Sequence, residues 1–181
     1  MNKPDLTPLN LKTERLVLRP LTFEDTPFIT KLLNDPDYIR NIGDRKVRTT
    51  DDAGHYLTTG PMESYKTHGY GLLCTTLKPE TEKSAGTPIG TCGLLKRDFL
   101  DYPDLGYAFL PEFRAMGYAG EAAAGVLQWG KKIFDFSRIG AIVNPDNQAS
   151  IRLLERIGFS YEKEVTIPET KKAVKLFVAE L

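Results

Sequence analysis

The stretch with the most evident chemistry runs from Arg114 to Ala122, where an apolar run ends and an amphipathic pattern begins. The first turn of a helix leaves backbone N–H groups without intrahelical partners, and these groups carry a partial positive charge. The small residues Gly117, Ala119 and Gly120 would let a phosphate or pyrophosphate approach that backbone closely. The Arg114 guanidinium can pair with a phosphate oxygen. The pattern predicts a site for an anionic ligand, although a tight turn and close helix–sheet packing would also explain the glycines.

A second polar constellation spans residues 144–159. Asn144, Asn147 and Ser150 recur at every third position, and this spacing can direct their side chains toward one cleft. Taken alone, Asn147 and Ser150 are more simply explained as helix-capping and solvent-exposed groups. Together with the first stretch, they favour a shared binding site.

Both constellations fall where a strand gives way to a helix. The apolar run at residues 105–110 has the length and aromatic content of a buried strand, and Pro111 ends it by removing a ladder donor. An amphipathic helix is expected over residues 119–134 and a compact one over residues 149–157. A strand at residues 138–143 separates the two helices. Strand and helix therefore alternate in this half of the chain.

The rest of the chain is expected to complete one mixed fold. Residues 1–12 form a polar lead-in, and one early helix ends near Leu33, where Asn34, Asp35 and Pro36 follow. A second helix begins after Thr49 or Thr50 and is interrupted at residues 60–61. Further strands are expected at residues 15–19, 70–77, 88–95, 160–167 and 173–181.

Composition limits the classes of function. The 181 residues, 41% hydrophobic and 27% charged, suit a single domain over residues 1–181 with a sizeable core. The 24 basic and 24 acidic residues balance, so no global charge favours a nucleic acid or an anionic membrane as partner. The N-terminus lacks the apolar core of a signal peptide, and no apolar run approaches a membrane span. A soluble, cytoplasmic protein is predicted.

The two cysteines and the two histidines are assigned no chemistry. Cys74 and Cys92 lie singly in apolar runs without CxxC spacing, which is typical of reduced core thiols rather than of zinc ligands. His55 and His68 are isolated histidines, and His68 before Gly69 is typical of a helix end or loop, so neither is assigned a catalytic role. The sequence therefore predicts no metal site.

These motifs together resemble the GNAT superfamily of acyl-CoA-dependent N-acyltransferases. Arg114-x-x-Gly117-x-Ala119 resembles the pyrophosphate-binding signature of that superfamily, and residues 144–159 resemble its second cofactor motif. Residues 11–20 and 105–107 resemble the opening and central strands of the branch typified by ribosomal-protein N-alanine acetyltransferases. The resemblance covers almost the whole chain.

The resemblance implies an α/β (α+β) fold with a mixed, splayed and twisted central β-sheet that carries helices on both faces. Acetyl-CoA would lie in the splay, and no metal would be needed. The resemblance assigns its pyrophosphate to the backbone of the turn and its pantetheine arm to the strand end and the second motif. The residues implied in cofactor binding are Phe109, Leu110, Arg114, Met116, Gly117, Tyr118, Ala119, Gly120, Asn144 and Asn147.

The implied reaction is direct attack of a primary amine on the thioester. The ammonium must first lose a proton, and the departing thiolate benefits from a hydroxyl donor. Asp104 is the candidate base, and a water chain is the alternative. A simpler interpretation of Asp104 is a loop carboxylate that faces water and has no catalytic role. Ser150 is the candidate hydroxyl donor.

The resemblance leaves the acceptor and the oligomeric state open. The acceptor amine can belong to a peptide or protein N-terminus, an amino acid or a small molecule, and the protein can be a monomer or a homodimer. The alternative function is a noncatalytic acyl-CoA-binding regulator on the same scaffold.

Overall fold

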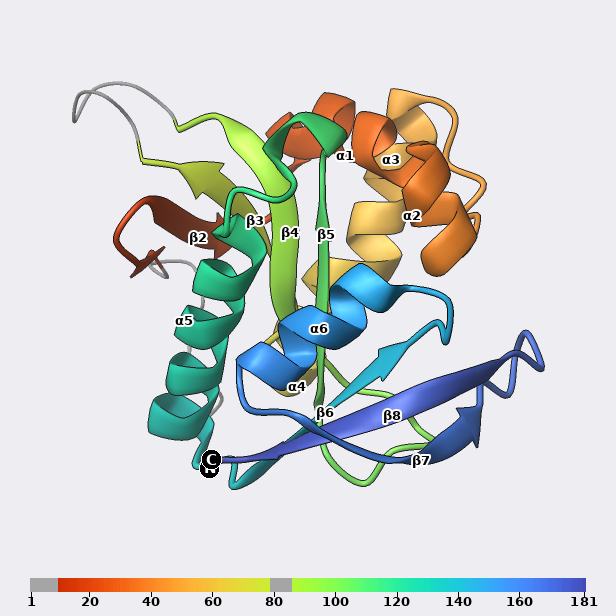
Figure 1. The fold of residues 1–181 in the computed structure, drawn as a ribbon. Helices are drawn as coiled ribbons and strands as arrows, with labels where there is room; N and C mark the ends of the chain where they lie inside the picture. Colours follow the sequence, from red (N-terminus) through yellow and green to blue (C-terminus); the bar gives the residue numbers. More distant parts are fainter. Residues whose placement is uncertain (1–9, 79–85) are drawn as a thin grey trace.

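The residues that the structure describes form an eight-stranded mixed β-sheet at the centre of the protein (Figure 1). The computed structural model describes residues 10–78 and 86–181. The strands lie in the order β1-β2-β3-β4-β5-β6-β8-β7. Their bounds are β1 Leu11–Lys12, β2 Leu16–Pro20, β3 Leu72–Leu77, β4 Pro88–Leu95, β5 Asp104–Phe109, β6 Arg138–Val143, β7 Ser160–Thr166 and β8 Ala173–Glu180.

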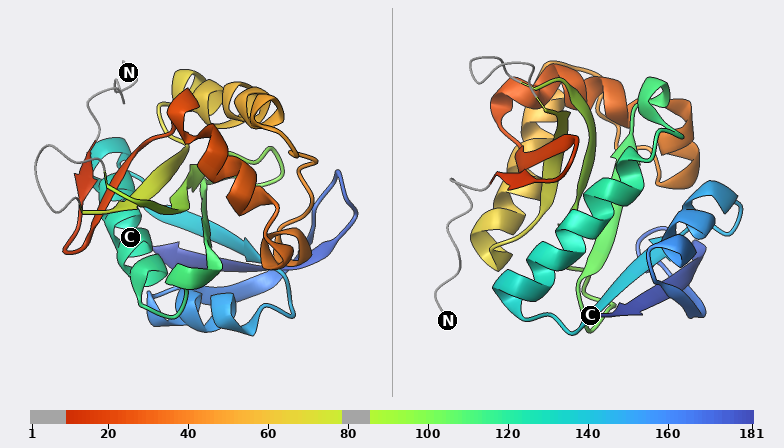
Figure 2. Two further views of the ribbon diagram at one scale, coloured as in Figure 1. Left: turned by 90° about the horizontal axis from the view of Figure 1, so that it is seen from above. Right: turned by 60° about the vertical axis from the view of Figure 1, so that its left-hand side comes forward.

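Helices cover both faces of this sheet, as the sequence predicts (Figure 2). The first face carries α1 Thr26–Leu33, α2 Pro36–Asn41, α3 Thr50–Leu57 and α4 Glu63–His68. The opposite face carries α5 Tyr118–Phe134 and α6 Gln148–Arg156. Short 3-10 turns at Phe23–Asp25 and Pro111–Phe113 precede α1 and the α5 turn. Each face therefore has its own apolar core, with the sheet between them.

The sheet opens between β5 and β6. Strand β5 is paired with β4 over residues 104–109, whereas its parallel pairing with β6 consists of the single pair Asp104 and Gly140. Strand β6 is fully paired on its other side with β8. The two strands therefore separate toward Phe109 and Val143, and the predicted splay is confirmed (Figure 1).

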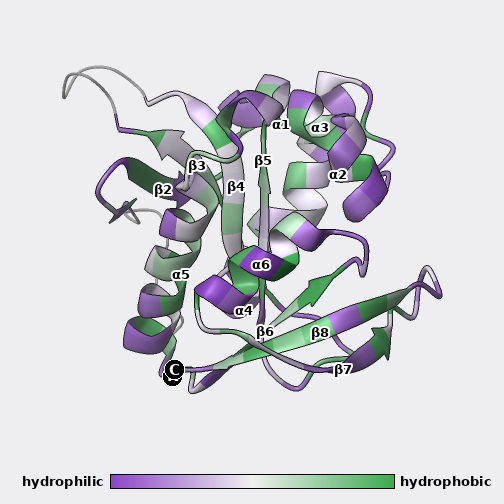
Figure 3. Cartoon of the chain, in the orientation of Figure 1, coloured by the Kyte–Doolittle hydropathy of each residue, from purple (hydrophilic) through white to green (hydrophobic). Residues whose placement is uncertain are grey.

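Helix α5 packs one face on the strands beside this opening. Ala122, Ala123 and Val126 are fully buried against β4 and β5, and hydrophobic and hydrophilic residues alternate along the helix in Figure 3. Trp129 lies opposite much of the apolar face of this helix, a position for which the helical pattern predicts only partial packing at the surface. It is nevertheless only 6% exposed and packs edge-on against Phe134, so its indole belongs to the core.

The early helices differ from the sequence prediction at two points. Residues 34–36 end α1, as predicted, and they also begin a further helix, α2. The Asp35 side chain accepts the Tyr38 N–H at 3.1 Å and caps α2, with Pro36 in its first turn. The expected interruption at residues 60–61 is a π-helical turn, Thr58–Met62, that continues into α4.

The predicted polar lead-in overlaps the sheet at its C-terminal end. Leu11 and Lys12 pair with Leu18 and Val17 as strand β1. Residues 1–9 lie outside the described part of the chain.

Candidate functional site

The turn that precedes α5 exposes a row of backbone N–H groups. Gly117 has a φ of +83° and Ala115 a φ of +60°, so the chain reverses sharply before the helix begins. The first intrahelical bond runs from the Glu121 N–H to the Gly117 carbonyl at 3.1 Å. The N–H groups of Tyr118, Ala119 and Gly120 therefore precede the helical ladder, as an anion-binding helix start requires.

The two glycines of this turn serve different purposes. Gly117 is exposed, and a Cβ there would lie 3.2 Å from Nη2 of Arg15 as well as straining the backbone. A Cβ on Gly120 would lie 3.2 Å from Cδ1 of Leu153 on α6. The Cβ position on Gly120 faces α6 rather than the sheet, so Gly120 permits the close approach of α5 and α6 instead of the expected helix–sheet packing. Gly117 shapes the turn.

Arg15 is the cation that lies against this turn. It donates from Nη1 to the Met116 carbonyl at 3.0 Å and from Nε to Glu121 at 2.7 Å, and its guanidinium stands 4.5 Å from the centre of the Tyr118 ring. From the other side, the Arg156 guanidinium of α6 comes within 3.7 Å of the Cβ position on Gly120. Two arginines from distant parts of the sequence thus flank the start of α5.

Arg114 points away from the turn, toward α2. Its Nη1 donates to Asp37 at 2.6 Å, its Nη2 pairs with Asp35, and its Nε donates to the Phe109 carbonyl at 2.8 Å. To contact a phosphate over the turn, the guanidinium would have to leave these partners. The predicted phosphate contact of Arg114 stays a prediction, and the ion pairs argue against it.

The end of β5 offers fewer free backbone groups to a pantetheine arm than the sequence analysis predicts. The Leu110 N–H donates to Ile89 at 2.9 Å, and its carbonyl accepts the Phe113 N–H at 3.0 Å. Leu110 therefore has no free donor for a pantetheine amide. Because successive residues of a strand direct their backbone groups to opposite neighbours, the Phe109 N–H faces the splay, while the Phe109 carbonyl is occupied by Arg114.

Ser150 lies beside the hydroxyl of a tyrosine to which the sequence analysis assigned no role. Its Oγ lies 2.6 Å from the hydroxyl oxygen of Tyr107 on β5. Burial raises the pKa of Tyr107 to about 12, although the bond to Ser150 partly opposes this. Tyr107 is therefore protonated at neutral pH and, with Ser150, forms a hydroxyl pair that can donate a proton between β5 and α6.

Asp104 lies at the closed end of the splay. It is 1% exposed, and both of its carboxylate oxygens accept from Nε of Arg97 at 2.9 Å. Burial raises its pKa above the usual range, and the Arg97 charge opposes that shift. The simpler interpretation, a loop carboxylate facing water, is wrong because Asp104 begins β5 and is buried.

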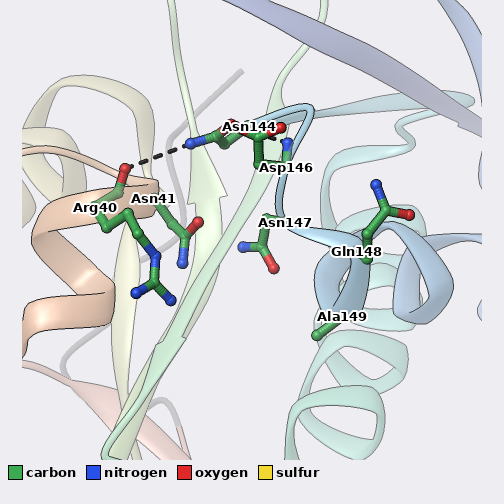
Figure 4. A pocket seen from close by; sticks show the side chains of 7 residues that line it. All are labelled: Arg40, Asn41, Asn144, Asp146, Asn147, Gln148 and Ala149. Carbon is green, nitrogen blue, oxygen red and sulfur yellow. Dashed lines mark hydrogen bonds between the residues drawn. The ribbon is translucent and has the colours of Figure 1, made fainter.

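A pocket of about 300 Å³ lies between α2 and the loop that leads from β6 to α6 (Figure 4). Asn144 closes one side by donating to the Arg40 carbonyl at 3.4 Å and accepting the Asp146 N–H at 3.1 Å. The Asn147 Oδ1 caps α6 by accepting the Ser150 N–H at 3.1 Å, as the simpler interpretation predicts. The side chains that line the pocket are polar apart from that of Ala149; they belong to Arg40, Asn41, Asn144, Asp146, Asn147 and Gln148.

Tyr107, Arg15, Arg40 and Arg156 are site residues to which sequence reasoning assigned no role. Alternation along β5 places Tyr107 on the same face as Leu105 and Phe109, and this face is covered by α5 and α6. That pattern could have identified Tyr107. Arg15 and Arg40 carry no comparable signal, because each reaches the site from a segment about 100 residues away in the sequence.

Three comparisons agree with this architecture. The sequence model of the acetyltransferase (GNAT) domain family matches residues 15–160. The uncharacterized N-acetyltransferase YoaA of Bacillus subtilis (strain 168) is 30% identical, over 84% of this chain and 83% of that protein.

Two solved structures share the fold. An acetyltransferase from Agrobacterium tumefaciens str. C58 has a TM-score of 0.80 at 21% identity and covers 100% of this chain and 99% of that chain. The ribosomal L7/L12 α-N-protein acetyltransferase RimL, solved in complex with coenzyme A, has a TM-score of 0.78 at 14% identity, with coverage of 96% and 98%.

The chain belongs to the GNAT acetyltransferase family. It is an acetyl-CoA-dependent acetyltransferase, and its likeness to the ribosomal-protein acetyltransferases is confirmed as a likeness of fold.

Two further findings concern the described residues alone. None of their helices has both the length and the apolar character needed to cross a bilayer. Their His, Cys, Asp and Glu side chains also form no group of three or more that could hold a metal ion.

Proposed function

We propose that the protein transfers an acetyl group from acetyl-CoA to a primary amine by direct attack within a ternary complex. The observation that carries this proposal is the splay between β5 and β6, which has the turn of backbone N–H groups before α5 at its mouth and the Tyr107–Ser150 hydroxyl pair along its wall. The amine can belong to a peptide or protein N-terminus, an amino acid or a small molecule.

The residues around the splay fit the cofactor. The N–H groups of Tyr118, Ala119 and Gly120 would hold the pyrophosphate, with Met116 and Gly117 shaping the turn. Arg15 and Arg156 would add positive charge on either side. The Phe109 N–H and the Asn147 amide, which lines the pocket, would hold the pantetheine arm, and Asn144 would fix the loop between them.

When bound, acetyl-CoA supplies an acetyl group activated as a thioester. The acceptor nitrogen forms the new bond to the acetyl carbon as the carbon–sulfur bond breaks, and its surplus proton leaves to a base. Ser150, backed by Tyr107, donates a proton or a hydrogen bond to the departing sulfur. The protein needs no nucleophile of its own.

Either Asp104 or a water chain can receive the proton of the acceptor ammonium. A raised pKa suits a general base, but Asp104 is buried and both of its oxygens are held by Arg97. We therefore favour the water chain and assign Asp104 the role of closing the splay.

Replacement of Asp104 by Asn tests this choice. We expect Asp104→Asn to lower the free energy of unfolding by about 3 kcal/mol, because it leaves the largely buried Arg97 guanidinium without its counter-ion. Turnover per folded molecule should change less than about three-fold, since a lost general base costs roughly 100-fold or more. Urea denaturation and steady-state rates of thiol release measure the two effects. A folded variant with 100-fold slower turnover would instead identify Asp104 as the base.

Calorimetric titration of acetyl-CoA into the purified protein tests the proposed cofactor site. Acetyl-pantetheine, which lacks the pyrophosphate, is the control ligand, and we expect it to bind at least about ten-fold more weakly because it cannot contact the α5 turn. Equal binding of both ligands would refute the assigned pyrophosphate site. If acetyl-CoA binds but no amine from a panel of peptides, amino acids and small amines releases thiol, the noncatalytic regulator is favoured.

A further inference from the structure

Arg114 connects the open end of β5 with the start of α2, and these contacts point to a role other than that of a phosphate ligand. We propose that Arg114 is a positioning residue that couples the cofactor-binding turn to α2, so that cofactor binding also fixes the wall of the pocket that α2 forms. This inference rests on the proposed cofactor site.

The guanidinium of Arg114 bridges three separate segments. Its Nε holds the Phe109 carbonyl at the open end of β5, while Nη1 and Nη2 hold Asp37 and Asp35 of the α2 start. Five fixed donors in one plane make such a bridge possible for arginine, whereas lysine carries a single point charge. The side chain of Arg114 is 33% exposed and that of Asp35 only 7%, so one of the ion pairs is well shielded from water.

Asp35 is also the residue on which α2 depends. The same Oδ1 that pairs with Arg114 accepts the Tyr38 N–H at the helix start. The guanidinium therefore holds α2 by its capping residue, and α2 is only six residues long. A helix of this length is marginal without tertiary contacts, so its order depends on such partners.

The connection continues from α2 to the pocket. Asp37 pairs with Arg40 at 2.5 Å in the next turn of the helix. The Arg40 side chain lines the pocket, and its carbonyl accepts from Asn144 of the second cofactor motif. Figure 4 shows Arg40 and Asn41 on one side of the pocket and Asn147, Gln148 and Ala149 on the other. A continuous set of contacts thus runs from the α5 turn through α2 to the opposite wall.

Arg114 immediately precedes the left-handed residue Ala115, where the cofactor-binding turn begins. Ligand contacts to the N–H groups beyond Ala115 fix the backbone of the turn and therefore the position from which the Arg114 side chain extends. Because that side chain is tied to Asp35 and Asp37, a fixed turn should suppress opening of α2.

Hydrogen exchange of α2 with and without coenzyme A tests the coupling. In wild type, saturating coenzyme A should slow exchange of the amides of Ile39, Ile42 and Gly43, which donate to Asp35 and Tyr38 carbonyls, by roughly five-fold or more. Arg114→Gln should abolish this slowing. Arg114→Lys keeps the positive charge but lacks the planar set of N–H donors of a guanidinium, so it should retain only part of the slowing.

Two further variants separate coupling from general stability. Asp35→Asn keeps a good helix-capping side chain but removes the charge that Arg114 contacts, so it should also lose the effect of coenzyme A. Lys31→Gln removes an exposed ion pair of 2.6 Å between α1 and Glu112 in the same region, and it should retain the wild-type effect.

Calorimetry on the same samples distinguishes the possible failures. If coenzyme A binds wild type but leaves α2 exchange unchanged, or if Arg114→Gln retains the slowing, the coupling is refuted while the cofactor site stands. If wild type binds no coenzyme A, the proposed cofactor site fails, and the coupling fails with it.

Discussion

Gly117→Val should remove most of the affinity for coenzyme A while leaving the protein folded. Valine at a φ of +83° is strained by about 1–2 kcal/mol, and its side chain would approach Nη2 of Arg15. The turn would have to rotate, and the N–H groups of Tyr118 and Ala119 would no longer converge on one anion. A hydrogen bond to a charged group contributes about 1.5–3 kcal/mol, so losing one weakens affinity roughly 10- to 100-fold, and losing two weakens it by roughly 100-fold or more.

Gly158→Val is the matched control for backbone strain. Gly158 has a φ of +98° and open space around its Cβ position, and it follows the C-terminal end of α6 rather than standing in the turn that precedes α5. We expect both variants to lose similar stability in urea denaturation, but only Gly117→Val to lose affinity in calorimetry. Wild-type affinity in a folded Gly117→Val protein would refute the predicted pyrophosphate position.

The sequence predicted the parts of the site that depend on local backbone geometry. Gly117 and Pro111 predict the α5 turn. A glycine readily adopts the left-handed conformation that the turn requires, and a proline ends the strand because it has no N–H to donate to the ladder. The capping role of Asn147 is equally local. For the same reason, Leu105–Leu110 could be identified as a buried strand from its apolar run alone.

The partners of charged side chains could not be predicted in the same way. Arg114 follows the strand end at a position that suits a phosphate ligand, but its ion pairs involve residues 77 and 79 positions earlier. Asp104 and Arg97 are only seven residues apart, yet the buried pair forms because the fold encloses both. Such contacts depend on how α2 and the β4–β5 connection pack, and no local periodicity encodes that packing.

Removal of either hydroxyl of the Tyr107–Ser150 pair should slow turnover by about 100-fold, the range expected when a proton or hydrogen-bond donor is lost from a reacting centre. Tyr107→Phe and Ser150→Ala should both leave the affinity for coenzyme A within about three-fold of wild type, because neither contacts the α5 turn. If the two hydroxyls act as one unit, the double variant should be little slower than the slower single variant. Steady-state thiol release, with any amine that wild type acetylates, measures these rates.

Tyr65→Phe is a suitable control for the loss of a buried hydroxyl. The Tyr65 hydroxyl accepts the Leu21 N–H at 3.1 Å and pairs with the Leu72 carbonyl, outside the splay. Its removal should cost stability, about 1–3 kcal/mol for the groups left unpaired, with turnover unchanged. A comparable loss of turnover in Tyr65→Phe would attribute the effect of Tyr107→Phe to destabilisation.

The pH dependence of turnover separates donation by Tyr107 from its ionisation. Burial raises the pKa of Tyr107 to about 12, so the phenol keeps its proton through neutral and moderately alkaline pH, and its contribution is lost only as pH approaches and passes that pKa. Turnover should therefore rise with pH as the acceptor amine loses its proton, and Tyr107→Phe should lower this curve without changing its shape. An alkaline fall in wild-type turnover near pH 9 that disappears in Tyr107→Phe would show that the phenol ionises there, and would contradict a donor held protonated by burial.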